Sequence, residues 1–367
     1  MASTLSDTAP GATKPSEIWF TRCPVPTATG LAYQLGWFDQ AFAADGVSVQ
    51  TLQETPELGR HHYDHRLSTL IREGGSMLAI AARAQGEPTR LVGLTWIEEA
   101  QVILVRPDSG IKTAADLKGK RVALPGWTDH EIASHLRGCS ISRGMSLLGL
   151  RGALASAGLT FDDVTVVEIA SPPRGESGGR RDSLAGRSGG LGRLWPIDAL
   201  VDGRVDAVYV KGASALDAAQ AHGVVVGINL DRLPDRRFRV NNGTPRPITV
   251  HQDLIDNHFD YLVRFLATTL RAADWATTNA DHLRAIAQTE TLGSPQAVID
   301  AYGEEFHLNL HPDLDDERLT LFEEQKKALL LHGFLDRDFD LNGWIDRRPL
   351  EAARALIEKE KHAALIA

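Results

Sequence analysis

Short apolar runs alternate with longer segments of helical spacing along most of the chain. The run Ile18-Trp19-Phe20 is typical of a buried strand, and Pro24 and Pro26 end it. The expected strands cover 17–22, 47–52, 91–96, 102–105, 121–125, 164–169, 205–210, 224–228 and 245–250. The expected helices cover 29–44, 77–84, 113–117, 147–156, 196–202, 259–278, 279–288, 293–302, 314–331 and 349–364. This alternation predicts an α/β fold with mostly parallel sheets and helices on both faces.

The order of these elements predicts two lobes. The chain crosses to a new strand–helix unit near 106–112 and returns near 240–248. We therefore expect a first lobe of 17–108 and 243–367, a second lobe of 109–242, and a ligand cleft between them. Composition predicts a disordered tail over 1–16 and a flexible, Gly-, Arg- and Ser-rich loop over 171–192.

Composition narrows the class of protein. The net charge of −9 argues against a nucleic-acid partner, because phosphates require a basic surface. No stretch approaches the roughly 18 apolar residues of a membrane helix, so we expect no membrane segment. The beginning of the chain lacks a basic start and an apolar core, which predicts a cytoplasmic protein, although a chain with its signal removed would look the same. Two cysteines fit a reducing compartment.

The first group of residues with a candidate catalytic or binding role begins where the first strand ends. Cys23 follows that strand, and a thiol at a strand end beside a helix N-terminus can be reactive; the alternative is a small buried hydrophobe. Arg72, Gly74 and Gly75 precede an apolar helix, where bare N–H groups and a planar guanidinium suit a small oxyanion. The alternative for these three residues is a helix cap with a surface arginine.

The histidine cluster after the second strand allows two interpretations. His61, His62, Asp64 and His65 contain metal-ligand types, but their spacing does not match a hydrolytic zinc site, so we expect no metal. A histidine that shares a proton with Cys23 fits better, and His62 is our candidate.

Weaker candidates lie in the expected second lobe. Lys211 follows a strand that would end at the cleft, with a surface turn as the alternative, and Met145 lies near a helix start. Cys139 has no partner signal and is interpreted as structural. Dinucleotide, phosphate-loop and nucleophile-elbow motifs are absent from the sequence, which argues against nucleotides, flavins and serine hydrolysis.

Two strings carry a resemblance to a known superfamily. The sequences AADLKGKRVA at 114–123 and ALVDGRVDA at 199–207 resemble solute-binding proteins for sulfonates, taurine and nitrate. The resemblance implies the two-lobed type II periplasmic-binding-protein fold. This fold serves transporters, regulators and enzymes alike, so it does not by itself define a function.

A narrower resemblance is to the 2'-hydroxybiphenyl-2-sulfinate desulfinase family. It rests on the string Cys-Pro-Val-Pro at 23–26, on His62, and on Arg-x-Gly-Gly at 72–75. It implies hydrolysis of an aryl carbon–sulfur bond with release of sulfite and without a cofactor. Cys23 would be the catalytic thiol and His62 its partner. Arg72 and the backbone of Gly74 and Gly75 would hold the sulfinate oxygens. Our further candidates for substrate binding are His65, Lys211 and Met145.

The chain departs from the family pattern at three places, and the first is the insertion over 171–192, which is specific to this chain. Arg22 stands where the family has asparagine, and Met145 stands where we expect an aromatic residue against a biaryl substrate. Two hypotheses follow: a cysteine-dependent desulfinase, or a solute-binding protein that delivers an aromatic sulfonate to a transporter permease without turnover. A ligand-sensing protein is a third alternative.

Overall fold

The computed structural model describes residues 14–127, 137–170 and 196–366. The predicted loop 171–192 and most of the predicted tail 1–16 lie outside these residues. Among the described residues, no helix combines the length and the apolar character that a membrane span requires.

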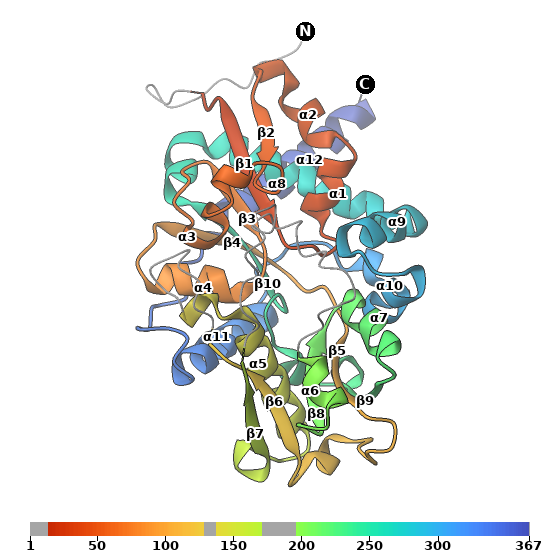
Figure 1. Cartoon of the computed structure of the whole chain (residues 1–367). Coiled ribbons are helices and arrows are strands. Elements are labelled where there is room, and N and C mark those ends of the chain that lie inside the picture. Colours follow the sequence, from red (N-terminus) through yellow and green to blue (C-terminus); the bar gives the residue numbers. More distant parts are fainter. Residues whose placement is uncertain (1–13, 128–136, 171–195, 367) are drawn as a thin grey trace.

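The first sheet has the strand order β2-β1-β3-β10-β4. The parallel neighbours β2, β1 and β3 are followed by β10, which runs antiparallel between β3 and β4. The strands are β1 (Glu17–Arg22), β2 (Ser48–Thr51), β3 (Leu70–Glu73), β4 (Thr89–Thr95) and β10 (Arg246–His251). This sheet forms the upper part of the molecule in Figure 1.

The second sheet repeats this plan with the order β7-β6-β8-β5-β9. Here β5 runs antiparallel between β8 and β9, whereas β7, β6 and β8 are parallel. The strands are β5 (Gln101–Val105), β6 (Arg121–Pro125), β7 (Thr165–Ile169), β8 (Ala207–Lys211) and β9 (Val225–Asn229). Each sheet is therefore mixed and contains one antiparallel strand. The chain enters the second sheet at β5 and returns to the first sheet at β10.

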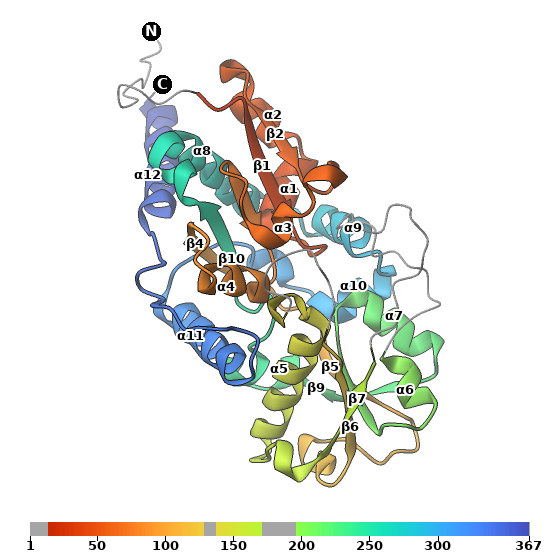
Figure 2. The ribbon, with the colours of Figure 1, turned by 60° about the vertical axis from the view of Figure 1, so that its left-hand side comes forward.

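Helices flank both sheets (Figures 1 and 2). In the first half of the chain they are α1 (Ala28–Gln34), α2 (Trp37–Phe42), α3 (His61–Asp64), α4 (Ser76–Ala84), α5 (Ile141–Ser156), α6 (Ile197–Val201) and α7 (Ala213–Ala221). They continue with α8 (Gln252–Ala276), α9 (Ala280–Thr291), α10 (Pro295–Tyr302), α11 (Asp316–Leu331) and α12 (Arg348–Ile366). The long helices α8 and α12 pack side by side beside the first sheet in both views.

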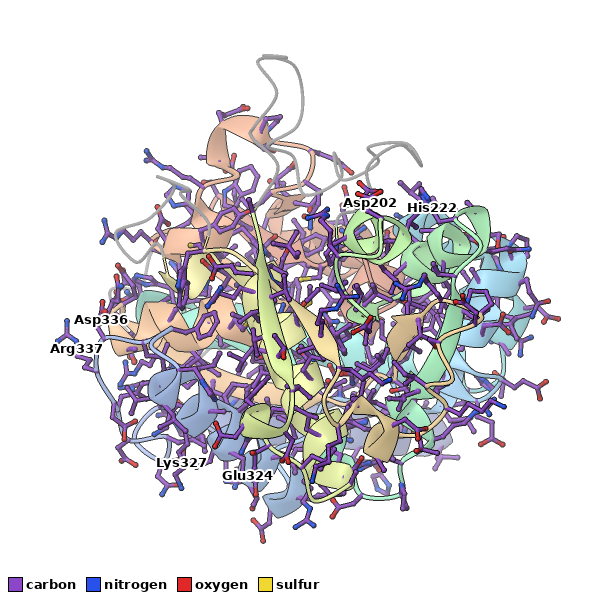
Figure 3. The ribbon with its side chains drawn as sticks, turned by 60° about the horizontal axis from the view of Figure 1, so that its bottom comes forward. Asp202, His222, Glu324, Lys327, Asp336 and Arg337 are labelled. Atoms are coloured by element: carbon purple, nitrogen blue, oxygen red, sulfur yellow. The ribbon has the colours of Figure 1, made fainter. Side chains whose placement is uncertain are left out.

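The two lobes pack against each other through an apolar cluster. Met77 of α4 and Phe334 share this cluster with Leu147 and Leu148 of α5. Gly144 makes the close approach possible, because a Cβ there would collide with the Met77 side chain. Charged side chains such as Lys327 and Arg337 lie around the outside of the molecule (Figure 3).

The fold class expected from the sequence is confirmed, with local corrections. The segment that carries Arg72 is the strand β3 rather than a helix start, and α7 was not expected. The predicted helix 29–44 is two helices, because Gly36 adopts a left-handed conformation with φ 69° between them. The chain reaches the second sheet at β5, before the predicted boundary at residue 109.

Candidate active site

Strand pairing brings Cys23 and Arg72 to the same end of the first sheet. In the parallel pair β1–β3, Thr21 lies opposite Arg72, and Cys23 follows two residues after Thr21. Because side chains alternate along a strand, residues two apart project from the same face. Carboxyl ends of parallel strands are where ligands bind in α/β sheets.

The Cys23 sulfur lies at the beginning of α4. The backbone N–H of Gly75 donates to Cys23 Sγ at 3.1 Å, and Gly75 is the N-cap of this helix. Cys23 is half-buried and is not in a disulfide. A backbone donor at a helix N-terminus can stabilise negative charge on a group that it contacts.

His62 lies beside the same strand end. Its Nδ1 and Thr21 Oγ1 are 3.0 Å apart, and its backbone carbonyl accepts a bond from Arg72 Nε at 3.3 Å. The ring is buried and packs edge-on against Tyr63. The structure therefore groups His62 with Arg72 on the Thr21 face of the sheet.

Arg72 is a buried cation with free donors. Its side chain is 1% exposed, and neither Nη1 nor Nη2 has a hydrogen-bond partner among the described residues. Burial is the main cause that lowers the pKa of Arg72 to about 10; Cys23 opposes this effect and Arg246 adds to it. The guanidinium remains charged at neutral pH and can donate to an anion.

The two glycines after Arg72 have different roles from those expected. The Gly74 N–H donates to the Pro247 carbonyl at 3.3 Å, so it is not available to hold a sulfinate oxygen as predicted. Gly74 instead leaves space, because a Cβ there would lie 2.9 Å from Arg72 Cζ. A Cβ at Gly75 would collide with the Asn242 side chain.

Sequence reasoning missed a second buried arginine. Arg246 at the start of β10 is 2% exposed, and its Nη2 lies 3.5 Å from Glu99 Oε2. Burial acts against its charge, but Cys23, Glu99 and Glu73 outweigh that effect and raise the pKa of Arg246. The sequence offered only an Arg-Pro pair far along the chain, and strand pairing with β3 is what places it here.

Lys211 and Met145 line a separate cavity in the second lobe. It measures about 200 Å³ and is bounded by Pro125, Ser142, Met145, Ser146, Pro196, Ile197, Tyr209, Val210, Lys211 and Ala215. Lys211 Nζ donates to the Asn242 carbonyl at 2.9 Å and lies 3.4 Å from Glu99 Oε2. Burial lowers the pKa of Lys211 and Glu99 opposes this. Lys211 thus connects the cavity to Asn242, whose side chain lies against Gly75.

The remaining cysteine and histidines have structural positions. His61 Nδ1 pairs with Asp64 Oδ1 at 2.8 Å, and His65 is buried at the end of α3 with φ 57°. No group of three or more His, Cys, Asp or Glu in the described part of the chain could hold a metal ion. Burial raises the pKa of Cys139 to about 11, which disfavours its thiolate.

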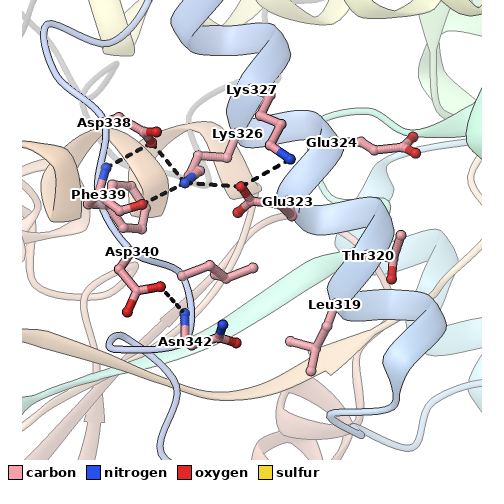
Figure 4. Close-up of a pocket in the computed structure, with 11 residues that line it drawn as sticks. Leu319, Thr320, Glu323, Glu324, Lys326, Lys327, Asp338, Phe339, Asp340 and Asn342 are labelled. Carbon is pink, nitrogen blue, oxygen red and sulfur yellow. Dashed lines mark hydrogen bonds and ion pairs between the residues drawn. The ribbon is translucent and has the colours of Figure 1, made fainter.

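A larger surface hollow lies away from this chemistry (Figure 4). It has a volume of about 820 Å³ and is lined by α11 and residues 338–342. The Lys326 ammonium inside it contacts Asp338 Oδ1 at 2.8 Å and Glu323 Oε1 at 3.2 Å. None of the predicted site residues borders this hollow.

Fold and site together define a two-lobed α/β protein of the periplasmic-binding-protein type with a thiol beside a buried arginine. A family model described as NMT1/THI5 like matches residues 31–173. The periplasmic aliphatic sulphonate binding protein SsuA from Escherichia coli has the same fold, with a TM-score of 0.62 and 18% identity over 91% of this chain and 92% of that chain.

More particular relatives are desulfinases. The chain is 28% identical to the 2'-hydroxybiphenyl-2-sulfinate desulfinase of Rhodococcus erythropolis over 346 residues, which are 89% of this chain and 90% of that relative. A crystal structure of a cysteine-to-serine mutant of DszB in complex with biphenyl-2-sulfinic acid has a TM-score of 0.70 and 25% identity, and covers 92% of this chain and 99% of that chain. The predicted resemblance to both groups is confirmed.

Proposed function

We propose that this protein is a cysteine-dependent desulfinase that hydrolyses an aryl sulfinate to the arene and sulfite. The observation that carries the proposal is the contact between Gly75 N–H and Cys23 Sγ, together with the buried Arg72, whose Nη1 and Nη2 have no hydrogen-bond partner among the described residues. The desulfinase relatives, which align over most of the chain, support the same reaction.

The reaction needs a group that binds the sulfinate anion, a proton for the ring carbon and a hydroxyl group for the sulfur. Overall, sulfinate and water give arene and hydrogen sulfite: the carbon–sulfur bond breaks, a proton reaches the carbon, and the hydroxyl of water reaches sulfur. Arg72 binds the sulfinate oxygens through its free Nη atoms. Cys23 either gives its proton to the carbon or attacks the sulfinate sulfur, and both routes keep this balance.

His62 is suited to exchange a proton with the Cys23 thiol. The contact with Thr21 Oγ1 fixes the position of its ring, and a fixed imidazole can take up or return a proton near neutral pH. In this proposal His62 restores the protonation state of Cys23 after each turnover. No step requires a cofactor.

Sulfite release from a panel of aryl sulfinates tests the proposal, with wild type, Cys23→Ser and Cys139→Ser measured in parallel. We expect turnover that is lost in Cys23→Ser and retained in Cys139→Ser, since Cys139 is buried and its thiolate is disfavoured. Full turnover in Cys23→Ser would exclude thiol catalysis.

The fold of SsuA supports a second candidate function, a solute-binding protein for an aromatic sulfonate or a related anion. A transporter permease would then be its partner. This candidate predicts stoichiometric, saturable binding of aryl sulfonates and no sulfite release from any sulfinate. The panel above therefore distinguishes the two candidates directly.

A further inference from the structure

Arg246 lies alongside the residues that contact Cys23. The Gly74 N–H bonds to the Pro247 carbonyl in the antiparallel pair β3–β10. Arg246 precedes Pro247 on β10, and Gly75, whose N–H reaches Cys23 Sγ, follows Gly74. Both Arg72 and Arg246 interact electrostatically with Cys23 and with each other.

The Arg246 guanidinium is held in place but only partly paired. Its Nη2 lies 3.5 Å from Glu99 Oε2, while Nε and Nη1 are buried and have no hydrogen-bond partner among the described residues. Gly243 gives it room, because a Cβ there would lie 2.7 Å from Arg246 Nη2. Buried polar groups normally have partners, so donors without a described partner on two arginines that both act on Cys23 indicate a ligand position.

The charges around the two arginines favour an anionic ligand at this position. Glu99 is shared between Arg246 and Lys211, which leaves more positive than negative charge in this group. With Glu73 counted as a second carboxylate, the cations Arg72, Arg246 and Lys211 still outnumber the carboxylates Glu99 and Glu73. Buried like charges are costly unless an anion compensates them.

We propose that Arg246 is a second oxyanion-binding residue, which together with Arg72 holds the sulfinate of the substrate and the sulfite of the product. This inference rests on the proposed function for the identity of the substrate, but it makes a separate statement about anion binding. A free sulfite carries three oxygens, enough to accept from two guanidiniums, so inorganic sulfite should bind on its own and inhibit competitively.

Calorimetric titration of wild type, Arg246→Gln and Arg239→Gln with inorganic sulfite tests the proposal. Arg239 is the matched control, because it is also a largely buried arginine of the crossover but its charge is paired with Glu98 at 2.7 Å. We expect sulfite affinity to fall by about 10- to 100-fold in Arg246→Gln, the range for a lost charged hydrogen bond, and by less than about twofold in Arg239→Gln. Equal affinity of wild type and folded Arg246→Gln would overturn the proposal.

Two further measurements apply if Arg246→Gln does not fold. Arg246→Lys keeps the charge beside Glu99 but lacks the planar fork, and we expect its sulfite affinity to fall about tenfold. A crystal structure of wild type with sulfite needs no variant: a sulfite oxygen within hydrogen-bond distance of Arg246 Nε or Nη1 supports the role, and sulfite on Arg72 alone contradicts it.

Failure of this inference can be separated from failure of the proposed function. Sulfite affinity that depends on Arg246 would support the anion site even if no aryl sulfinate were hydrolysed. Sulfite affinity that ignores Arg246 would remove the residue from the site while leaving Cys23-dependent turnover intact.

Discussion

At the scale of single residues, close packing around Arg72 sets the geometry of the candidate site. Gly74 has no side chain, and the Arg72 guanidinium occupies the space that a Cβ would take, with Cζ and Nη2 both 2.9 Å away and Nη1 at 3.0 Å. Any displacement of the guanidinium would change its position relative to Cys23. Gly74 therefore contributes to the anion site by leaving space for the guanidinium and not by donating its N–H.

Gly74→Ala should reduce catalysis while the fold persists. Displacing the guanidinium by a few tenths of an ångström to one ångström should lower kcat/KM by about 10- to 100-fold, measured as sulfite release. The double variant with Arg72→Met is the control: if the loss arises from Arg72, Gly74→Ala should add little in that background. Additive losses would show that the alanine acts elsewhere.

A buried carboxyl in the crossover should make stability depend on pH. Asp231 Oδ2 accepts from the Gln101 N–H at 2.9 Å, and burial is the main cause that raises the pKa of Asp231 from 3.8 to about 6. The folded state therefore holds a proton that the unfolded state has lost between these pH values. Stability should fall as pH rises from about 4 to about 6, by about 3 kcal/mol in total.

Urea unfolding of wild type and Asp231→Asn at pH 4.5 and pH 7 measures this contribution. The asparagine keeps an acceptor for Gln101, so we expect the variant to gain stability relative to wild type at pH 7 but not at pH 4.5. The same difference between the two proteins at both pH values would contradict the assignment.

Residues of the candidate site could be identified from the sequence where a local signal marks each of them. Cys23, His62 and Arg72 stand out because a strand end, a polar loop and a glycine pair are local signals. Arg246 and Asn242 give no such signal. They reach the site only because β10 pairs with β3 after the chain has passed through the whole second lobe.

At the scale of elements, short strands and glycine turns account for the errors in the expected structure. The four residues of β3 contain Arg72 and Glu73, whose charges conceal a strand that is buried along its whole length. The helix expected over 29–44 ends early because Gly36 adopts a positive φ. The long amphipathic helix α8 was recognisable, since its apolar spacing continues over several turns.

A buried lysine should hold the segment after α11 in place. Lys326 contacts Glu323, Asp338 and the Phe339 carbonyl, the last at 2.5 Å (Figure 4). Burial acts against its charge, but Asp338 and Glu323 outweigh it and raise the pKa of Lys326. Lys326→Met should therefore lower the free energy of unfolding by about 1–3 kcal/mol, the cost of leaving these acceptors unpaired.

Lys327→Met is the matched control for this prediction. Lys327 is exposed and lies 3.6 Å from the same Glu323 oxygen, so its loss should change stability by less than about 0.5 kcal/mol. Chemical denaturation of both variants decides the question. Equal effects would mean that the hollow beside α11 does not depend on the buried ammonium.

At the scale of the whole molecule, one reversed strand in each sheet explains both the two-lobed shape and the misplaced boundary. The sequence predicts the apolar run of β5 as an edge or crossing strand, and the predicted boundary leaves it in the first lobe. In the structure β5 pairs with β8 and β9, so the crossover lies between Thr95 and Gln101. Sequence periodicity identifies a strand but not the sheet that it joins.

Contacts between the lobes should control ligand affinity. Asp217 of α7 accepts from the Ser294 N–H at 2.7 Å and from Ser294 Oγ at 2.6 Å, at the start of α10. These bonds join the second lobe to a helix that follows the return of the chain to the first. A ligand held by both lobes binds best when they are in contact, so weakening the contact lowers the population competent to bind.

Asp217→Asn should weaken this contact by about 1 kcal/mol and raise KM for the sulfinate about fivefold, with little change in kcat. Asp198→Asn is the control, because Asp198 is an exposed carboxylate on α6 of the same lobe. Small-angle scattering should show a larger radius for unliganded Asp217→Asn than for the control. If KM and radius both stay at the wild-type values, affinity is set within the first lobe, and the buried pair Arg72 and Arg246 holds the anion without help from lobe closure.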